Sequence, residues 1–181
     1  EYDRNYESGI STVKKFVEAF KKKSNNEASV GIAIPGYSSK ETGLVHNANS
    51  NWLNNKHFKK DLEKNLNCEI KIMNDANCFT LSEAIDGAGK DFKSVFGIII
   101  GTGFGSGLSY KKEIIEGANQ VAGDWGHQPL PYPTEEEKNS KIKCTLPTCG
   151  RPMCAEQFIS GAGFAKNFNL KHNTNYKAPE I

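Results

Sequence analysis

The chain has 181 residues, enough for one domain with a sizeable core, or for one domain and part of another. Its 23 basic and 21 acidic residues nearly cancel, and no broad basic stripe with interleaved aromatics occurs, so composition gives no reason to expect a nucleic-acid partner. The longest apolar run, residues 95–100, is far too short to span a bilayer, and no signal-peptide pattern occurs. We expect a soluble, cytoplasmic protein with no membrane partner.

Helices and short strands alternate along the first hundred residues. Apolar residues at helical spacing predict helices at about 10–23, 56–66 and 76–84. Runs rich in β-branched residues predict strands at 30–34, 69–73 and 95–100. The last strand has no polar alternation, which is typical of a strand covered on both faces. Alternation of helices and strands predicts an α/β layered fold, and a hairpin pattern at 108–115 favours a mixed sheet over a purely parallel one.

The second half of the chain contains a long segment with no apolar periodicity. Residues 126–153 are rich in proline, glycine and charge and are too long for an ordinary connection, so something other than a hydrophobic core must order them. Helical periodicity returns at Ala155 and is interrupted by glycines at 161 and 163. The chain opens at Glu1 without a methionine and stops just after a helix-start pattern at 178–180, which favours an incomplete protein.

A glycine-rich turn, residues 101–107, directly follows the most apolar strand. Its glycines allow backbone amides to come close to an anionic phosphate. The segment lacks the lysine of a P-loop, and a hairpin rather than a helix follows it, so it matches neither common phosphate fingerprint. A tight hairpin that binds no ligand is the alternative interpretation.

A polar cluster, Asn74-Asp75-Ala76-Asn77, stands where a strand ends and a helix begins, the place where α/β sheets present side chains to ligands. Asp75 can cap the helix. It can also act as a general base that accepts the proton of a sugar hydroxyl while that oxygen attacks a terminal phosphoryl group, and both roles can hold at once. Polar side chains at 47–51 suit a sugar site, although such asparagines more often form turns.

Soft metal ligands gather in the long loop. Four residues there, His127, Cys144, Cys149 and Cys154, fit the donor set of a closed structural zinc site. Reduced cysteines in a loop without metal are the alternative, because two successive four-residue gaps are wide for zinc ligands. Asp124 lies three residues before His127, so a metal would also fix this carboxylate.

In order and spacing, these motifs resemble the ROK family of sugar kinases and sugar-responsive repressors. The resemblance extends from about residue 3 to the end and rests on Pro35-Gly36, Asn74-Asp75-Ala76-Asn77, Gly101-Thr102-Gly103, Asp124-Trp125-Gly126-His127, and Cys149-Gly150 through Cys154-Ala155-Glu156. It implies an actin-like ATPase (ribonuclease H-like) fold of two lobes, with ATP and sugar between them and a zinc-bearing loop beside the sugar. Residues 1–95 would form most of the N-terminal lobe, and 96–181 the start of the C-terminal lobe.

The resemblance implies a role for each matching residue. Asp75 matches the catalytic base. Residues at matching sugar-contact positions are Gly36, Asn49, Asn74, Asp75, Asp124, His127 and Glu156. Residues matching the ATP phosphate turn are Gly101, Thr102, Gly103, Phe104, Gly105, Ser106, Gly107 and Leu108. Residues matching the zinc site are His127, Cys144, Cys149 and Cys154.

Three departures from the family pattern limit this transfer. Asp124 stands where the family has glutamate, so the carboxylate is drawn back by one methylene and its sugar contact can become water-mediated. Pro147 stands where the first zinc cysteine belongs, with Cys144 three residues earlier. No Asp-x-Gly-Gly-Thr phosphate loop occurs, so we expect this chain by itself to bind ATP poorly and not to turn over.

The favoured hypothesis is a kinase that transfers the γ-phosphoryl group of MgATP to N-acetyl-D-glucosamine, giving the 6-phosphate. Glucose, fructose and N-acetylmannosamine are the alternative acceptors. A sugar-sensing repressor of the same family is the second hypothesis, although retention of Asp75 favours catalysis. A zinc-stabilised binding domain without activity is the third. The expected partner is the sugar itself, with a homodimer left open.

Overall fold

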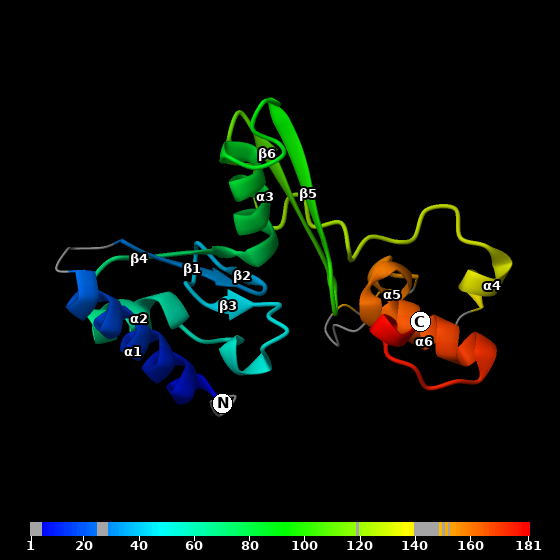
Figure 1. Ribbon diagram of the computed structural model, residues 1–181, viewed down its shortest axis with the longest axis horizontal. Helices are drawn as coiled ribbons and strands as arrows, with labels where there is room; N and C mark the ends of the chain where they lie inside the picture. Colours follow the sequence, from blue (N-terminus) through cyan, green and yellow to red (C-terminus); the bar gives the residue numbers. More distant parts are fainter. Residues whose placement is uncertain (1–4, 25–28, 119, 140–148, 150, 152) are drawn as a thin grey trace. The chain divides into compact units, whose positions relative to one another are not determined.

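The computed structural model describes residues 5–24, 29–118, 120–139, 149, 151 and 153–181 (Figure 1). The chain forms two compact units, Glu1–Cys78 and Phe79–Ile181, each described by itself below. Division of the lobes at residue 95 stays a prediction. Within the described ranges, no helix has both the length and the apolar character that a membrane crossing requires.

Two helices and two parallel strands make up most of the first unit. The helices are α1 (Tyr6–Ser24) and α2 (Phe58–Leu66), and the paired strands are β1 (Val30–Ile34) and β4 (Ile70–Asn74). Short elements complete the unit: β2 (Tyr37–Ser38), β3 (Val45–His46) and η1 (Asn51–Leu53). Helices α1 and α2 lie side by side below the strands (Figure 1). These helices and strands match the predictions closely, except that α1 begins a turn early, where the Asn5 side chain accepts the Ser8 N–H.

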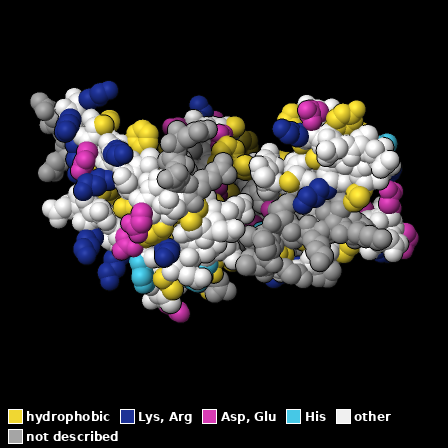
Figure 2. Space-filling model, turned by 90° about the horizontal axis from the view of Figure 1, so that it is seen from below, with side chains coloured by type: hydrophobic (Ala, Val, Ile, Leu, Met, Phe, Trp, Pro, Cys, Tyr) yellow, Lys and Arg dark blue, Asp and Glu magenta, His cyan; other side chains and the backbone are white. Residues whose placement is uncertain are grey.

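The core of the first unit forms where the apolar face of α2 meets α1 and the strands. Phe58, Leu62 and Leu66 are four residues apart and therefore share one helix face, and all three are buried. Ile34 and Ile70 are buried on the strands against the same cluster. Lysines of both helices point the other way, and Figure 2 shows basic side chains spread over this outer face. A solvated helix surface accounts for them.

Helix α3 (Asp75–Ile85) begins in the first unit and ends in the second. Its second half packs on β5 (Ser94–Ile100), which pairs with β6 (Phe104–Tyr110), and β6 pairs with β7 (Glu113–Ile114); both pairings are antiparallel. A Cβ atom at Gly97 would lie 2.1 Å from Oγ1 of Thr80, so only glycine permits this close approach of helix and sheet. Parallel and antiparallel pairings both occur, as a mixed architecture requires, but in separate sheets.

Strand β5 corrects one prediction. Phe96, Ile98 and Ile100 remain 48%, 45% and 64% exposed, so the strand is not covered on both faces by the described residues. Successive side chains of a strand point to opposite faces, and only the face of Gly97 meets α3. An unbroken apolar run therefore did not distinguish two covered faces from one.

Short helices complete the second unit: α4 (Glu135–Lys138), α5 (Glu156–Ile159), α6 (Gly161–His172) and η2 (Ala178–Glu180). The interruption predicted at the two glycines is the break between α5 and α6. Ser160 causes it, because its hydroxyl accepts the Gly163 N–H and thereby starts a new helix. The hairpin predicted at 108–115 is also confirmed, with both turn residues, Lys111 and Lys112, at positive φ.

Candidate functional site

The carboxyl end of β4 presents Asn74 and Asp75. Asn74 uses both ends of its amide for structure: Oδ1 accepts the Asn77 N–H at 3.1 Å and Nδ2 donates to the Gly36 carbonyl at 3.0 Å. Asn74 therefore makes the bond of a helix cap, a role that the sequence offered to Asp75. The Asp75 carboxylate is exposed and accepts the adjacent N–H of Ala76 at 2.9 Å. Its backbone is fixed by the neighbour while its carboxylate faces solvent.

Cys78 lies one turn along α3 from Asp75. Burial raises the pKa of the Cys78 thiol, and the negative charge of Asp75 raises it further. A thiol with a raised pKa stays neutral near pH 7 and is a poor nucleophile. Cys78 therefore behaves as a small packing residue.

The Pro35–Gly36 turn is packed tightly against the strand that precedes the asparagine-rich loop. Gly36 has φ of 75°, and a Cβ atom there would lie 2.1 Å from the His46 carbonyl oxygen. The loop itself is held by Asn54, whose amide bonds the N–H and the C=O of Ala48, each at 2.9 Å. Asn49 follows in an exposed bend. The first unit thus brings together Gly36, Asn74 and the loop that carries Asn49.

The glycine turn is shorter than predicted. Residues 104–107 belong to β6 and pair with β5, so only Gly101, Thr102 and Gly103 form the loop. Glycine content alone could not show where the pairing starts. Inside the turn, the Gly101 N–H donates to the Gly103 carbonyl at 2.9 Å. Of the described residues, none accepts a hydrogen bond from the N–H of Thr102 or Gly103, and these two amides are open to a ligand.

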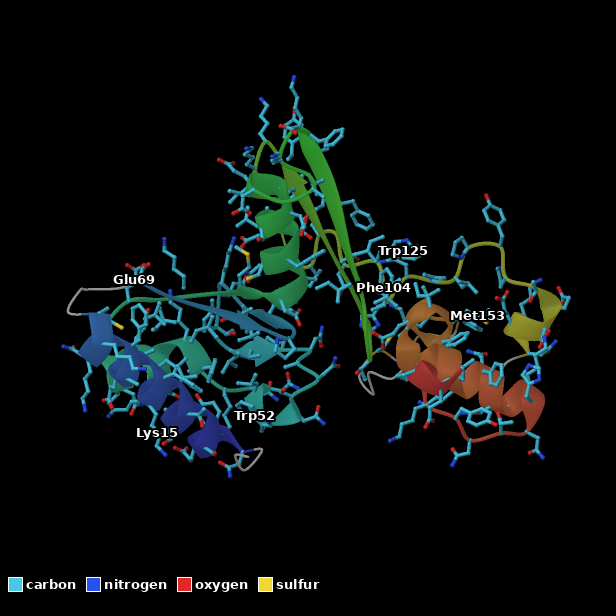
Figure 3. The ribbon with its side chains drawn as sticks, in the orientation of Figure 1. Lys15, Trp52, Glu69, Phe104, Trp125 and Met153 are labelled. Carbon is cyan, nitrogen blue, oxygen red and sulfur yellow. The ribbon has the colours of Figure 1, made fainter. Side chains whose placement is uncertain are left out.

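A segment that follows β7 covers one face of β6. The Ser106 hydroxyl donates to the Gly123 carbonyl at 2.6 Å and accepts the Trp125 N–H at 2.9 Å. The rings of Phe104 and Trp125, labelled in Figure 3, meet edge to face with centroids 5.7 Å apart. Asp124 is exposed and lies between Gly123 and Trp125, both of which are bonded to Ser106. Phe104 and Ser106, predicted only as part of a phosphate turn, thus hold the segment that carries Asp124.

Three of the four predicted metal ligands lie together. The side-chain ligand atoms of His127, Cys149 and Cys154 all fall within 4.8 Å of one another. The two sulfurs are 3.8 Å apart, and Cys154 Sγ lies 3.4 Å from His127 Nδ1. Tetrahedral zinc would place two thiolates about 3.8 Å apart, and a thiolate and an imidazole nitrogen about 3.5 Å apart. The donor set and its spacing therefore fit zinc, while Cys144 lies outside the described residues.

Pairing of two backbone segments brings the residues of this cluster together. Pro129 and Cys154 form an antiparallel bridge, flanked by a bond from the Leu130 N–H to the Met153 carbonyl at 2.7 Å. Figure 3 labels Met153, whose carbonyl accepts this bond. Cys154 is fully buried, and its Sγ also donates to the Gly126 carbonyl at 3.2 Å. Residues 23 to 28 apart in the sequence are thereby joined next to His127.

Glu156 is buried, and its carboxylate accepts the Phe104 N–H at 3.1 Å. The family resemblance implies a sugar contact at Glu156 but does not predict this bond to the edge of the glycine turn. Gly161, also not anticipated, donates its N–H to the Gly101 carbonyl at 2.8 Å. The Ser160-Gly161 pair at a helix start was the one signal in the sequence that could have pointed to it.

Solved structures identify the class of fold. A ROK hexokinase from Thermus thermophilus superposes with a TM-score of 0.80 at 18% identity, covering 97% of this chain and 56% of that one. A ROK family glucokinase from Streptomyces griseus, in complex with glucose and AMPPNP, gives 0.73 at 23% identity, covering 95% and 52%. A ROK family transcriptional regulator gives 0.69 at 20% identity, covering 92% and 41%. The actin-like ATPase fold predicted from the motifs is confirmed.

Sequence comparison identifies the family. Residues 2–181 match the ROK family, and the chain belongs to it. It is 35% identical over 177 residues to the N-acetyl-D-glucosamine kinase of Vibrio cholerae, covering 98% of this chain and 59% of that protein. It is 38% identical over 155 residues to the enzyme of the same name from Aliivibrio salmonicida, covering 86% and 51%. The chain thus spans little more than half the length of these relatives.

Proposed function

We propose that the protein to which these residues belong is an ATP-dependent sugar kinase that phosphorylates N-acetyl-D-glucosamine on its 6-hydroxyl. Support for the acceptor comes from the two relatives of that name, at 35% and 38% identity. Support for ATP comes from the Streptomyces griseus glucokinase, whose structure holds AMPPNP. The proposal concerns the whole protein, because this chain matches only part of each relative.

The observation that carries the proposal is the state of Asp75. Its carboxylate is exposed at the carboxyl end of β4, and Asn74 rather than Asp75 makes the capping hydrogen bond of α3. Asp75 is thus available as the general base that accepts the proton of the 6-hydroxyl while that oxygen attacks the γ-phosphorus of ATP. Two side-chain hydrogen bonds hold Asn74 in place, so the backbone that carries the neighbouring Asp75 is held rigidly.

Sugar contacts are assigned residue by residue, at the positions that match the family pattern. In the first unit we assign Gly36, Asn49 and Asn74, which lie on or beside one hydrogen-bonded turn. In the second we assign Asp124, His127 and Glu156. Asp124 is one methylene shorter than the glutamate of the family pattern, so its contact to a hydroxyl is expected through water.

The nucleotide is assigned to the glycine turn and β6, residues 101–108. The N–H groups of Thr102 and Gly103 are available to phosphate oxygens, as the bonding of the turn indicates. The N-terminus of α6 lies against the same turn through the Gly161 bond, and its positive dipole end favours a nearby anion. Mg²⁺ bound with ATP would neutralise phosphate charge; no residue of this chain is assigned to it.

A structural zinc ion is assigned to His127, Cys149 and Cys154, with Cys144 as the fourth ligand. The metal would supply the order that a hydrophobic core does not give the 126–153 loop. Coordination through Nδ1 would also fix the orientation of the His127 ring. The other ring nitrogen would then face the sugar.

A coupled ADP-release assay of the whole protein against several sugars tests the proposal. We expect the largest kcat/KM with N-acetyl-D-glucosamine, ahead of glucose, fructose and N-acetylmannosamine. Binding of a sugar with no ADP release would overturn the kinase proposal and favour a sugar-sensing regulator; one structural neighbour is named a ROK family transcriptional regulator. Zinc in the protein with no sugar binding at all would favour a purely structural domain.

A further inference from the structure

Glu156 connects the candidate metal site to the glycine turn. It follows Cys154 by two residues, and its backbone N–H donates at 2.9 Å to the carbonyl of Gly126, the residue before His127. Its side chain reaches the other way, where Oε2 accepts the Phe104 N–H at 3.1 Å. Phe104 is the first residue after the turn. The backbone of Glu156 thus belongs to the metal loop, and its carboxylate holds one end of the turn.

The same segment holds the other end of the turn. Helix α5 runs from Glu156 to Ile159, and the Gly161 N–H just beyond it donates to the Gly101 carbonyl at 2.8 Å. A Cβ atom at Gly161 would lie 2.8 Å from that oxygen, so the two backbones are in close contact. Gly101 and Phe104 therefore both depend on a segment that begins at a metal ligand.

The turn has little order of its own. A single internal bond, from the Gly101 N–H to the Gly103 carbonyl, is made among residues 101–103. Glycines lose more conformational freedom on folding than other residues, so external bonds must hold them. Glu156 is only 4% exposed, and a buried carboxylate or amide that loses its partner is strongly unfavourable. Glu156 and the Phe104 N–H are thus expected to remain paired wherever Glu156 is correctly placed.

Placement of Glu156 depends in turn on the metal loop. Its two anchors, Cys154 and Gly126, belong to a segment that is ordered by backbone pairing and by the cluster of His127, Cys149 and Cys154. Metal binding would fix Cys154, and through two residues of backbone it would fix Glu156.

We propose that Glu156 is a positioning residue that transmits metal occupancy at His127, Cys149 and Cys154 to the glycine turn. This inference rests on the metal and nucleotide assignments proposed above and adds to them a coupling between the two sites. Metal binding orders the turn before the nucleotide arrives. Since linkage is reciprocal, a nucleotide on the turn tightens the metal site by the same factor.

The test measures amide hydrogen exchange in peptides covering 101–108, using the whole protein loaded with zinc and the same protein stripped by a chelator. In the unmodified protein, we expect zinc to slow exchange of the Phe104 amide about tenfold or more. In Glu156→Ala, zinc should still bind, but its effect on Phe104 should fall below about twofold. Glu156→Gln keeps an acceptor oxygen and should restore most of the effect. Glu135→Ala, an exposed glutamate on α4, serves as the matched control.

Two outcomes would overturn the coupling: no zinc effect on Phe104 in the unmodified protein, or a full effect in zinc-loaded Glu156→Ala. Should the alanine variant fail to fold, Glu156→Asp replaces it, because the shorter side chain keeps the charge but cannot reach the Phe104 N–H.

AMPPNP binding separates this inference from the proposed function. We expect the affinity to fall about fivefold or more on zinc removal in the unmodified protein, and to be independent of zinc in Glu156→Ala. Equal AMPPNP affinity with and without zinc in the unmodified protein contradicts the coupling. Zinc protection of Phe104 with no AMPPNP binding at all supports the link through Glu156 and contradicts the nucleotide assignment instead.

Discussion

The end of β4 and the loop that ends at Glu156 both carry candidate functional residues, but they are ordered in different ways. Behind Asp75, the strands rest on an apolar core that includes Ile34, Leu62 and Ile70. Around Glu156, many of the buried groups are polar, among them Gln157 and Ser160. In the first region, the proposed catalytic side chain is exposed above an apolar core. In the second, the groups assigned to function also hold the structure.

Replacing Asp75 should separate chemistry from structure most clearly. In Asp75→Asn, kcat of the whole protein should fall about 10³-fold or more, the upper range for loss of a general base. Stability and sugar affinity should be unchanged, because the carboxylate is exposed and an amide oxygen can still accept the Ala76 N–H. Steady-state kinetics with denaturant unfolding measures both. Asp86→Asn, also exposed and just beyond α3, is the control and should keep normal turnover. Turnover within tenfold of normal in Asp75→Asn would contradict the base assignment.

The core beneath that region should show the opposite pattern. Leu62 is fully buried on α2, so Leu62→Ala should lower the free energy of unfolding by about 2–5 kcal/mol. Zinc content should not change, since the candidate metal ligands belong to the other unit. Lys60→Ala on the same helix is exposed and should change stability by less than about 0.5 kcal/mol. Loss of zinc in Leu62→Ala would show that the two regions are not independent.

In the second region, one substitution should remove order and function together. Cys149→Ser removes one of the three described candidate ligands, so zinc affinity, measured by competition with a chelator, should fall about 10–100-fold or more. Sugar affinity, measured by calorimetry, should also weaken, because a bound metal would no longer hold the His127 ring in place. Cys68→Ser, which lies outside the cluster, should change neither. Full zinc content in Cys149→Ser would exclude this cysteine as a ligand.

The smallest effect is expected at Tyr6, which supports the first core from its rim. Burial raises the pKa of Tyr6, and a hydrogen bond of 2.6 Å to Asp61 raises it further. The folded chain therefore keeps a proton that the unfolded chain loses near pH 10.0, so stability should fall as pH rises above that value. Tyr6→Phe should cost about 1 kcal/mol near pH 7 and reduce this decline. Unfolding at several pH values tests it, with Tyr37→Phe as control.

The same contrast explains how much could be predicted from sequence. Helical spacing located α2, and β-branched runs located β1 and β4, because the core of the first unit is built from local periodic patterns. The bond between Glu156 and Phe104 joins residues 52 apart and has no periodic signal.

Local composition also misjudged two features of the second unit. The glycine content predicted a turn up to residue 107, although the pairing of β6 with β5 begins at Phe104. The apolar run predicted that β5 is covered on both faces, although the described residues leave Ile98 and Ile100 exposed on one face. Where pairing begins and which faces are covered both depend on the segments that a strand contacts, and the strand's own sequence does not determine these.

The most direct test of the central claim is the identity of the product. The whole protein, given ATP and N-acetyl-D-glucosamine, should form a phosphomonoester whose phosphorus-31 signal is coupled to the two protons on carbon 6. Its rate of formation should fall about 10³-fold or more when Asp75 is replaced by asparagine. Phosphate on the anomeric oxygen, or no sugar phosphate from the zinc-loaded protein, would contradict the assignment of Asp75 as the base that activates the 6-hydroxyl.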